Sequence, residues 1–133
     1  MSLDDLLEAA KGAQARAYAP YSRFKVGAAV RGRDGRVYSG CNVENAAFPA
    51  GTCAEEAAIA AMVAAGESRI AEVLVIGCGD ALVTPCGACR QRIREFGAPD
   101  TAIHVADGSG LRKTFTLDDL LPFAFGPDNL TRP

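Results

Sequence analysis

Three stretches of the chain have the hydrophobic pattern or the end signals of helices. Residues 53–65 are almost continuously apolar and rich in alanine, which predicts a buried helix closed by Gly66. Pro85 suits the first turn of another helix, running to Gly97. Residues 3–18 carry an apolar stripe at helical spacing, with Ser2 as a candidate cap. The positions of the stripe are Leu3, Leu6, Leu7, Ala10, Ala13 and Ala17.

Strand signals fill much of the remaining chain. Asp34-Gly35 marks a tight turn between two of the predicted strands and therefore predicts a hairpin. The predicted strands are residues 24–31, 37–41, 73–76, 102–106 and 113–116, and a short helix is expected to start at Leu117. This order of helices and strands predicts an α/β sandwich on a mixed sheet, in a single domain that spans residues 1–133.

Composition and charge narrow the possible partners. The 133 residues are 49% hydrophobic and 23% charged, as in an ordinary globular domain, and the formal net charge is −2. Nucleic-acid binding depends on neutralising phosphates, yet the sequence has no run of Lys or Arg. No apolar run approaches the roughly 20 residues that a membrane span needs. We therefore expect a small-molecule ligand, with no nucleic-acid or membrane partner.

The cysteines and the single histidine limit the chemistry further. The start, Met1-Ser2-Leu3-Asp4-Asp5, has no basic and then apolar stretch of the kind found in signal peptides, so we expect a cytoplasmic protein. Five cysteines in a reducing compartment are ligands or core residues rather than a disulfide framework. His104 falls in a predicted strand, where a structural role is more common than a catalytic one.

Three cysteines stand at the starts of predicted helices. Cys53 opens one helix, and Cys86 and Cys89 open another within Pro85-Cys86-Gly87-Ala88-Cys89. Residues three apart share a helix face, and the partial positive charge of a helix N-terminus favours thiolate. Two such helices that meet at their N-termini could hold Zn²⁺ by three thiolates, which leaves the fourth position to water. We therefore predict one catalytic zinc per chain.

Glu55 lies two residues after Cys53, on the same opening turn. This spacing places a carboxylate beside the water of the metal without making it a fourth ligand. A carboxylate there can move the proton of a water whose pKa zinc has lowered. A Cys-x-Glu followed by Pro-Cys-x-x-Cys is typical of zinc-dependent deaminases, which predicts that Glu55 is catalytic.

Each half of this pattern has a simpler interpretation. Thr52 and Glu55 could form only a capping box at a helix start. Pro-Cys-x-x-Cys could be a redox dithiol. Both halves in the expected order favour the zinc site. Cys41 and Cys78 fall in strand-like positions without a matching partner, and we interpret both as small buried hydrophobic residues.

With these residues in view, the sequence resembles the small, homotetrameric branch of the cytidine deaminase family. Outside the zinc motif, three segments carry the resemblance in the family's order: Tyr21 to Ala29, Gly40-Cys41-Asn42-Val43-Glu44-Asn45, and Phe123-Ala124-Phe125-Gly126-Pro127. The resemblance implies a three-layer α/β/α sandwich on a mixed five-stranded sheet and a homotetramer. It also implies hydrolytic deamination of cytidine, and of 2′-deoxycytidine, in pyrimidine salvage.

The resemblance also implies roles for residues that bind the substrate. Asn42 and Glu44 would hydrogen-bond the ribose hydroxyls, and Phe24 would pack against the base and the sugar. The backbone near Ala54 would help to hold the base over the zinc. Phe125, and with it Phe48, would reach into the site of a neighbouring subunit. The apolar walls fit a neutral planar base.

The sequence departs from the family pattern at two positions. Many relatives carry an Arg directly after the glutamate of the zinc motif, where this chain has Glu56. Three thiolates leave a zinc site with a charge of −1, and another carboxylate would oppose formation of hydroxide. We therefore predict that Glu56 points away from the metal, or that Arg90 or another cation compensates. Phe48 stands where relatives often have Tyr, which removes one polar contact to the ribose.

Other functions fit parts of the sequence. A deaminase of another small molecule, such as blasticidin S or a different cytosine nucleoside, would keep the same zinc site. A nucleic-acid-editing deaminase is disfavoured by the acidic charge balance and the short chain. A structural zinc module would need a fourth protein ligand, and only three are evident. A redox dithiol would leave Cys53 and Glu55 unexplained.

Overall fold

The computed structural model describes residues 2–131. The helices are α1 (Leu3–Ala15), α2 (Ala54–Ala64), α3 (Gly87–Phe96), α4 (Leu117–Leu120) and α5 (Asp128–Thr131), with a 3-10 turn η1 (Phe48–Ala50). The strands are β1 (Gly27–Gly32), β2 (Val37–Cys41), β3 (Ile70–Ile76), β4 (Ala102–Asp107) and β5 (Gly110–Thr116). Within the described part of the chain, no helix has the length and apolar character required to cross a membrane.

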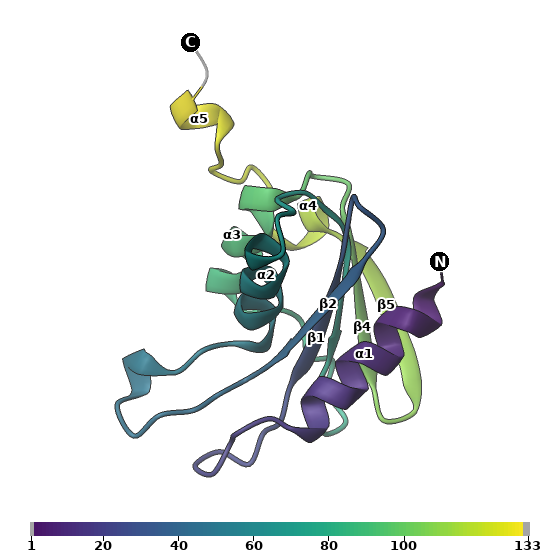
Figure 1. The fold of residues 1–133 in the computed structure, drawn as a ribbon, viewed down its shortest axis with the longest axis vertical. Helices are drawn as coiled ribbons and strands as arrows, with labels where there is room; N and C mark the ends of the chain where they lie inside the picture. The colour runs from purple at the N-terminus through teal and green to yellow at the C-terminus, as the bar shows by residue number, and fades with distance from the viewer. Residues whose placement is uncertain (1, 132–133) are drawn as a thin grey trace.

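The strands form one mixed sheet in the order β2-β1-β3-β4-β5. β3 and β4 are parallel, with α3 between them in the chain, and the other neighbouring pairs are antiparallel. Figure 1 shows α1 on one face of the sheet and α2 and α3 on the other. The predicted three-layer α/β/α sandwich on a mixed five-stranded sheet is therefore confirmed.

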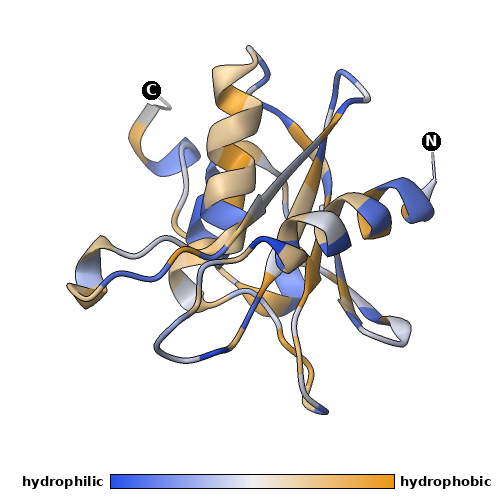
Figure 2. Ribbon diagram, turned by 60° about the horizontal axis from the view of Figure 1, so that its bottom comes forward, coloured by the Kyte–Doolittle hydropathy of each residue, from blue (hydrophilic) through white to orange (hydrophobic). Residues whose placement is uncertain are grey.

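Successive side chains of each strand point to opposite faces of the sheet, so the interior consists of two hydrophobic cores. Figure 2 shows hydrophobic residues along the central strands and most of α2, whereas α1 has one hydrophobic and one hydrophilic side. The core beneath α2 and α3 contains Ala28, Val30, Ala54, Ala58, Ile59, Met62, Ile70, Val73, Val75, Ile93, Ile103 and Leu117. The core beneath α1 contains Leu6, Ala10, Ala29, Leu74, Ile76 and Ala106. The two cores hold α1 and the pair α2 and α3 on opposite faces.

The first strand is shorter than predicted. β1 begins at Gly27, whereas the hydrophobic pattern predicted a start at Phe24. The Asn42 side chain bonds the intervening backbone, because Oδ1 accepts from Val26 N at 2.9 Å and Nδ2 donates to Phe24 O at 2.8 Å. These backbone groups are therefore bonded to a side chain instead of a neighbouring strand.

Two helix boundaries also differ from the prediction. α1 ends at Ala15, three residues early, and the Tyr18 backbone N–H then donates to Asn42 O at 3.0 Å. α3 begins at Gly87, so Pro85 precedes the helix and does not occupy its first turn. Ser2 stands at the N-terminus of α1, but its side chain makes no capping hydrogen bond. The short helix α5 was not predicted.

Close packing of β2 against α2 positions the start of α2. A Cβ on Gly40 would lie 2.5 Å from Ala58 N and 2.7 Å from Ala54 O. Glycine is therefore required for the approach of this strand to the helix that follows Cys53.

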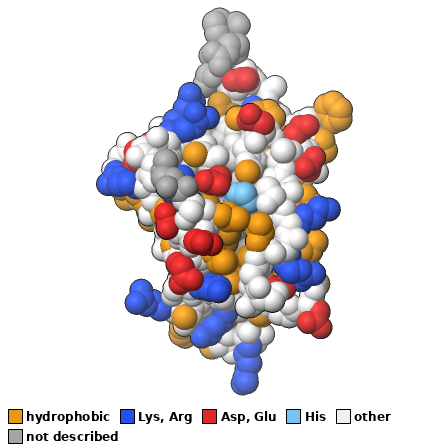
Figure 3. Space-filling view, turned by 90° about the vertical axis from the view of Figure 1, so that its right-hand side faces the viewer, with side chains coloured by type: hydrophobic (Ala, Val, Ile, Leu, Met, Phe, Trp, Pro, Cys, Tyr) orange, Lys and Arg blue, Asp and Glu red, His pale blue; other side chains and the backbone are white. Residues whose placement is uncertain are grey.

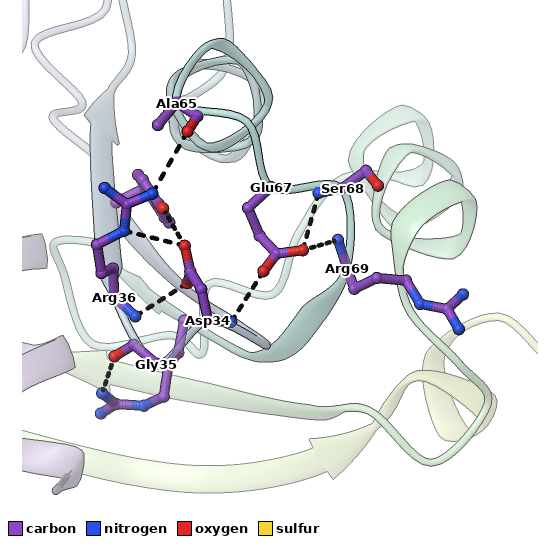
Figure 4. Close-up of polar contacts among 9 residues, drawn as sticks. Asp34, Gly35, Arg36, Ala65, Glu67, Ser68 and Arg69 are labelled. Atoms are coloured by element: carbon purple, nitrogen blue, oxygen red, sulfur yellow. Dashed lines mark hydrogen bonds and ion pairs between the residues drawn. The ribbon is translucent and has the colours of Figure 1, made fainter.

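The hairpin turn between β1 and β2 is tied to the far end of the same helix (Figure 4). Asp34 accepts from Arg36 Nε at 3.0 Å and from the Tyr38 hydroxyl at 2.6 Å. Arg36 also donates to Ala65 O at 3.3 Å, and Glu67 accepts from Asp34 N at 2.8 Å. Contacts at both ends of the hairpin therefore fix the position of α2.

His104 belongs to a polar cluster on the α1 face, visible in Figure 3 as the single histidine on that side of the molecule. Its Nε2 lies 2.9 Å from Glu72 Oε1, and its Nδ1 lies 2.8 Å from Thr114 Oγ1. Glu72 Oε2 in turn accepts from Arg31 Nε at 2.9 Å. The structural interpretation of His104 agrees with these contacts, which lie on the sheet face opposite α2 and α3.

Candidate active site

The thiols of Cys53, Cys86 and Cys89 come together where α2 and α3 begin. Cys53 and Cys86 are the residues that directly precede the two helices, and Cys89 lies in the first turn of α3. The three sulfurs lie within 4.8 Å of one another, and Cys53 Sγ is 4.0 Å from Cys86 Sγ. Sulfurs bound about 2.3 Å from one tetrahedral zinc stand about 3.8 Å apart, so small side-chain movements would suffice for one ion.

The electrostatics of this cluster favour a bound cation. Burial raises the pKa of Cys53, and the nearby Cys86 and Glu55 add to the effect. Burial likewise raises the pKa of Cys89, again with contributions from Glu55 and the other two thiols. Partial burial also opposes ionisation of Cys86, but its hydrogen bonds with Cys89 outweigh burial and lower its pKa. Three thiolates can therefore coexist here only if a cation offsets their repulsion, and a soft thiolate set fits Zn²⁺.

Glu55 is the second residue of α2, and its side chain is almost completely buried. Burial raises the pKa of its carboxyl group, which hydrogen bonding to its own backbone and the charge of Arg92 only partly offset. A buried carboxyl group with a raised pKa exchanges a proton near neutral pH more readily than an exposed one. Its position beside the thiols therefore suits a proton carrier.

The simpler interpretation of Thr52 and Glu55 as a capping box is wrong. Cys53 is the residue at the N-terminus of α2, so the third helical residue is Glu56. The Cys53 backbone N–H donates to Glu56 Oε1 at 3.1 Å. Glu56 therefore caps the helix, and Glu55 is left available to the site.

The cation that faces Glu56 is Arg92. Arg92 Nη2 lies 3.5 Å from Glu56 Oε2, and Arg92 Nη1 donates to Cys89 Sγ at 3.4 Å. Arg90 was the candidate named from the sequence, but its guanidinium donates to Pro85 O, Leu120 O and Thr84 Oγ1. Arg92 could have been found from its position three residues after Cys89 on the same helix.

A cavity of about 640 Å³ opens beside the thiols and has mainly apolar walls. Its volume is in the range usual for small-molecule sites. Five of the six predicted substrate-binding residues line this cavity together with Glu55, Cys53 and Cys86; they are Phe24, Asn42, Glu44, Ala54 and Phe48. The fold therefore brings segments far apart in the sequence to one cavity, with two of the three candidate metal ligands, Cys53 and Cys86, at its wall.

Asn42 and Glu44 already hold the chain segment that forms one wall of the cavity. Glu44 Oε1 accepts from Tyr21 N at 2.9 Å and from Ser22 N at 3.1 Å, and its Oε2 accepts from the Ser22 hydroxyl. The Ser22 hydroxyl hydrogen bond lowers the pKa of Glu44, with smaller effects from the two backbone bonds. Ionised Glu44 keeps lone pairs free for further donors. Its predicted ribose contact stays a prediction.

Phe125 is absent from the cavity wall within this chain. Its backbone carbonyl accepts from Gln91 Nε2 at 2.7 Å, and its side chain is 58% exposed. Phe48 lines the cavity but is 81% exposed. Two residues that sequence reasoning missed are Val83 and Thr84, which line the cavity from the loop before α3. No periodicity marks that loop, so only the fold shows its place.

Comparison with known proteins agrees with this geometry. The family model described as the cytidine and deoxycytidylate deaminase zinc-binding region matches residues 1–105. A cytidine deaminase of Sporosarcina psychrophila is 37% identical over 131 residues, which cover 98% of this chain and 96% of that protein. A cytidine deaminase of Mycobacterium tuberculosis is 42% identical over 121 residues, covering 90% and 86% of the two chains.

Solved structures show the same fold. The crystal structure of a cytidine deaminase from Burkholderia pseudomallei superposes with a TM-score of 0.87 at 44% identity, over 94% of this chain and 100% of that one. That of the Mycobacterium tuberculosis protein gives a TM-score of 0.80 at 40% identity, over 95% and 98%.

Proposed function

Because this chain belongs to the cytidine and deoxycytidylate deaminase family, we propose that it hydrolyses cytidine to uridine and ammonia. 2′-Deoxycytidine is the second expected substrate, and pyrimidine salvage is the expected role. The observation that carries the proposal is the position of buried Glu55 beside three clustered thiols, at the wall of a cavity large enough for a small molecule.

Cys53, Cys86 and Cys89 would hold one Zn²⁺ ion as thiolates. A zinc ion with three protein ligands acts as a Lewis acid that lowers the pKa of a water molecule toward neutrality. The N-termini of α2 and α3 contribute partial positive charge that favours the thiolate ligands.

Glu55 would move the protons of the reaction. Its carboxylate takes a proton from the attacking water and delivers it to ring N3, while the water oxygen adds to C4. The remaining hydroxyl proton then passes through Glu55 to the amino group, and the bond from C4 to that group breaks. Uridine and ammonia result, with Glu55 ionised again. A buried carboxyl group suits both directions of transfer because its two protonation states lie closer in free energy near neutral pH.

The remaining cavity residues would orient the nucleoside. Asn42 and Glu44 would bind the ribose hydroxyls, Phe24 would pack against the base and the sugar, and the backbone near Ala54 would hold the base over the metal. Phe48 lacks the hydroxyl that a Tyr would offer the ribose. Contacts that favour the 3′-hydroxyl would allow deoxycytidine to react.

Assembly into a homotetramer would complete the site. Phe48 is 81% exposed and Phe125 is 58% exposed, although both are large aromatic side chains. Burial of such groups against a neighbouring copy is favourable. In the assembly, Phe125 would reach the cavity of another subunit.

The proposal is tested by ultraviolet absorbance of cytidine with the purified, zinc-loaded protein and its Glu55→Gln variant. General acid–base catalysis contributes about 10²- to 10⁴-fold, so we expect the variant to lose turnover by that factor while it retains its zinc. Glu72→Gln is a matched control, since it removes a carboxylate from the opposite face of the sheet and leaves turnover intact.

A substrate panel separates the related reactions. Deoxycytidine, cytosine, blasticidin S and single-stranded DNA are offered beside cytidine. Wild-type protein with one zinc per chain that leaves cytidine and deoxycytidine unchanged would overturn the substrate assignment. Reduced protein that binds no zinc would overturn the mechanism.

A further inference from the structure

A continuous polar bridge joins the two helices that carry the thiols. On α2, Glu56 accepts from the Cys53 backbone N–H at 3.1 Å through one carboxylate oxygen. Its other oxygen lies 3.5 Å from Arg92 Nη2 on α3. Arg92 Nη1 then donates to Cys89 Sγ at 3.4 Å. Glu56 thus fixes the direction of the Arg92 guanidinium, and the guanidinium reaches a sulfur.

The charges along the bridge show what Arg92 contributes. Three thiolates around one Zn²⁺ leave a charge of −1, and Glu56 adds another negative charge beside them. Arg92 is the cation that contacts both Glu56 and a thiol, and its side chain is 38% exposed. Arg90 donates to other groups. Without Arg92, Glu56 would face the thiolates uncompensated.

The bridge lies outside the substrate cavity. Neither Arg92 nor Glu56 lines the cavity that contains Glu55 and Phe24. Both line a shallow groove between α2 and α3. Arg92 therefore acts on the reaction through Cys89, the metal and its charge near Glu55, and not through contact with the nucleoside.

We infer that Arg92 is a positioning residue for the zinc site, which supplies from α3 the positive charge that many relatives place directly after the zinc-motif glutamate on α2. Glu56 holds Arg92 against Cys89, so the pair Glu56–Arg92 acts as one unit. The inference deepens the proposed function and rests on zinc as the bound metal. Its consequence is that zinc affinity and turnover depend on Arg92, whereas nucleoside binding does not.

The test measures zinc affinity by competition with a chromophoric chelator, in reduced wild-type protein and in Arg92→Gln. Substitutions of residues that support metal ligands commonly reduce affinity or activity about 10- to 100-fold, and we expect a loss of affinity in that range. With cytidine, kcat is expected to fall about tenfold or more while KM changes less than about twofold. Arg94→Gln is the control, because Arg94 is on the same helix but its guanidinium lies beside Gly126, in the segment after α4.

A double variant gives the decisive result. Glu56→Arg combined with Arg92→Gln returns the positive charge to the position used by many relatives, and we expect it to recover most of the zinc affinity. Arg92→Lys keeps the positive charge but lacks the planar guanidinium that contacts both Glu56 and Cys89. We expect it to keep the fold and to have an intermediate zinc affinity.

Three results would overturn the inference. They are unchanged zinc affinity in Arg92→Gln, an equal loss in Arg94→Gln, and no recovery in the double variant when circular dichroism shows it folded. Zinc affinity is measured without nucleoside. Failure to deaminate cytidine would therefore count against the proposed function, while the zinc affinities of wild type and variants would still test the role of Arg92.

Discussion

Two clusters of ionisable side chains lie on opposite faces of the same sheet and differ in how their charges are balanced. On the α1 face, Glu72 accepts from Arg31 at 2.9 Å and lies 2.9 Å from His104. On the other face, Cys53, Cys86 and Cys89 crowd within 4.8 Å beside buried Glu55. In the first cluster each ionisable side chain is hydrogen-bonded to another member. In the second, the thiols and Glu55 could carry more negative charge than the neighbouring cations offset.

The pKa values of the two clusters reflect this difference. Partial burial opposes ionisation of Glu72, but hydrogen bonds from His104 and Arg31 outweigh it and lower its pKa. Burial dominates at Glu55 and raises its pKa. Partnered ionisable groups thus stabilise the fold, whereas a deficit of partners marks a place for a metal and a substrate. The following predictions test this contrast, from the largest expected effect to the smallest.

Removal of the metal should give the largest effect. A chelator in reducing buffer is expected to abolish cytidine turnover, and added Zn²⁺ to restore it. Zinc at about 1,000 times its dissociation constant stabilises the native state by about 4 kcal/mol, so the melting temperature should drop by about 10 °C or more on removal. Calorimetry measures the change in melting temperature. The NMR resonances of His104 report on the opposite face of the sheet, and they should persist after zinc is removed. Turnover that survives verified zinc removal would contradict it.

Glu72→Ala should destabilise the protein and leave its chemistry unchanged. The variant leaves Arg31, whose side chain is 5% exposed, without its carboxylate partner. Because Glu72 is itself 29% exposed, we expect a loss of about 2 kcal/mol, below the values for fully buried pairs. Urea denaturation measures the loss, with exposed Glu8→Ala as the control. A variant with full stability but reduced kcat/KM would reverse the roles of the two faces.

Glu55→Gln should have the opposite effect on the stability of the metal-free protein. Glutamine removes the cost of a buried carboxyl group with a raised pKa and nearly preserves its shape. We expect the apo variant to be more stable than apo wild type by about 1 kcal/mol, while Glu72→Gln is less stable. Parallel urea titrations of the three reduced proteins decide the point. A loss of stability in Glu55→Gln would show that the ionised group is satisfied in the fold.

The smallest expected effect is the loss of the Glu72 contribution to stability at acidic pH. The folded-state pKa of Glu72 lies below its ordinary value of 4.5, so its contribution is complete above that pH and is lost as the pH falls through the folded-state pKa. The stability difference between wild type and Glu72→Gln should therefore shrink between about pH 5 and pH 3. Urea midpoints across that range measure it. A difference that stays constant would exclude an ionised Glu72 as its source.

Local patterns were sufficient for much of the fold and for the candidate metal ligands. Cys86 and Cys89 are three apart at a helix start, so one turn of helix already places them on one face. Residues 53–65 are apolar almost throughout, and α2 buries Ala54, Ala58, Ile59 and Met62, although Val63 on its other side is 45% exposed. The cluster of Cys53 with the other two thiols follows once both helices begin at the same end of the sandwich.

Predictions failed where side chains from distant segments replaced regular backbone pairing. Phe24 to Val26 has the hydrophobic pattern of a strand, but Asn42 bonds its backbone from 16 and 18 residues away. These hydrogen bonds cannot be read from local spacing.

The sequence by itself determined most of the helices and strands, the identity of the candidate ligands and the spacing on which the proposed role of Glu55 rests. These features depend on neighbours within one turn of helix or one strand. Only the tertiary structure decided that Arg90 is engaged by Pro85, Leu120 and Thr84, which leaves Arg92 to face the thiols. It also decided that Val83 and Thr84 meet Phe24 and Asn42 at one cavity. Contacts between distant segments depend on how the layers pack, and no local pattern records that packing.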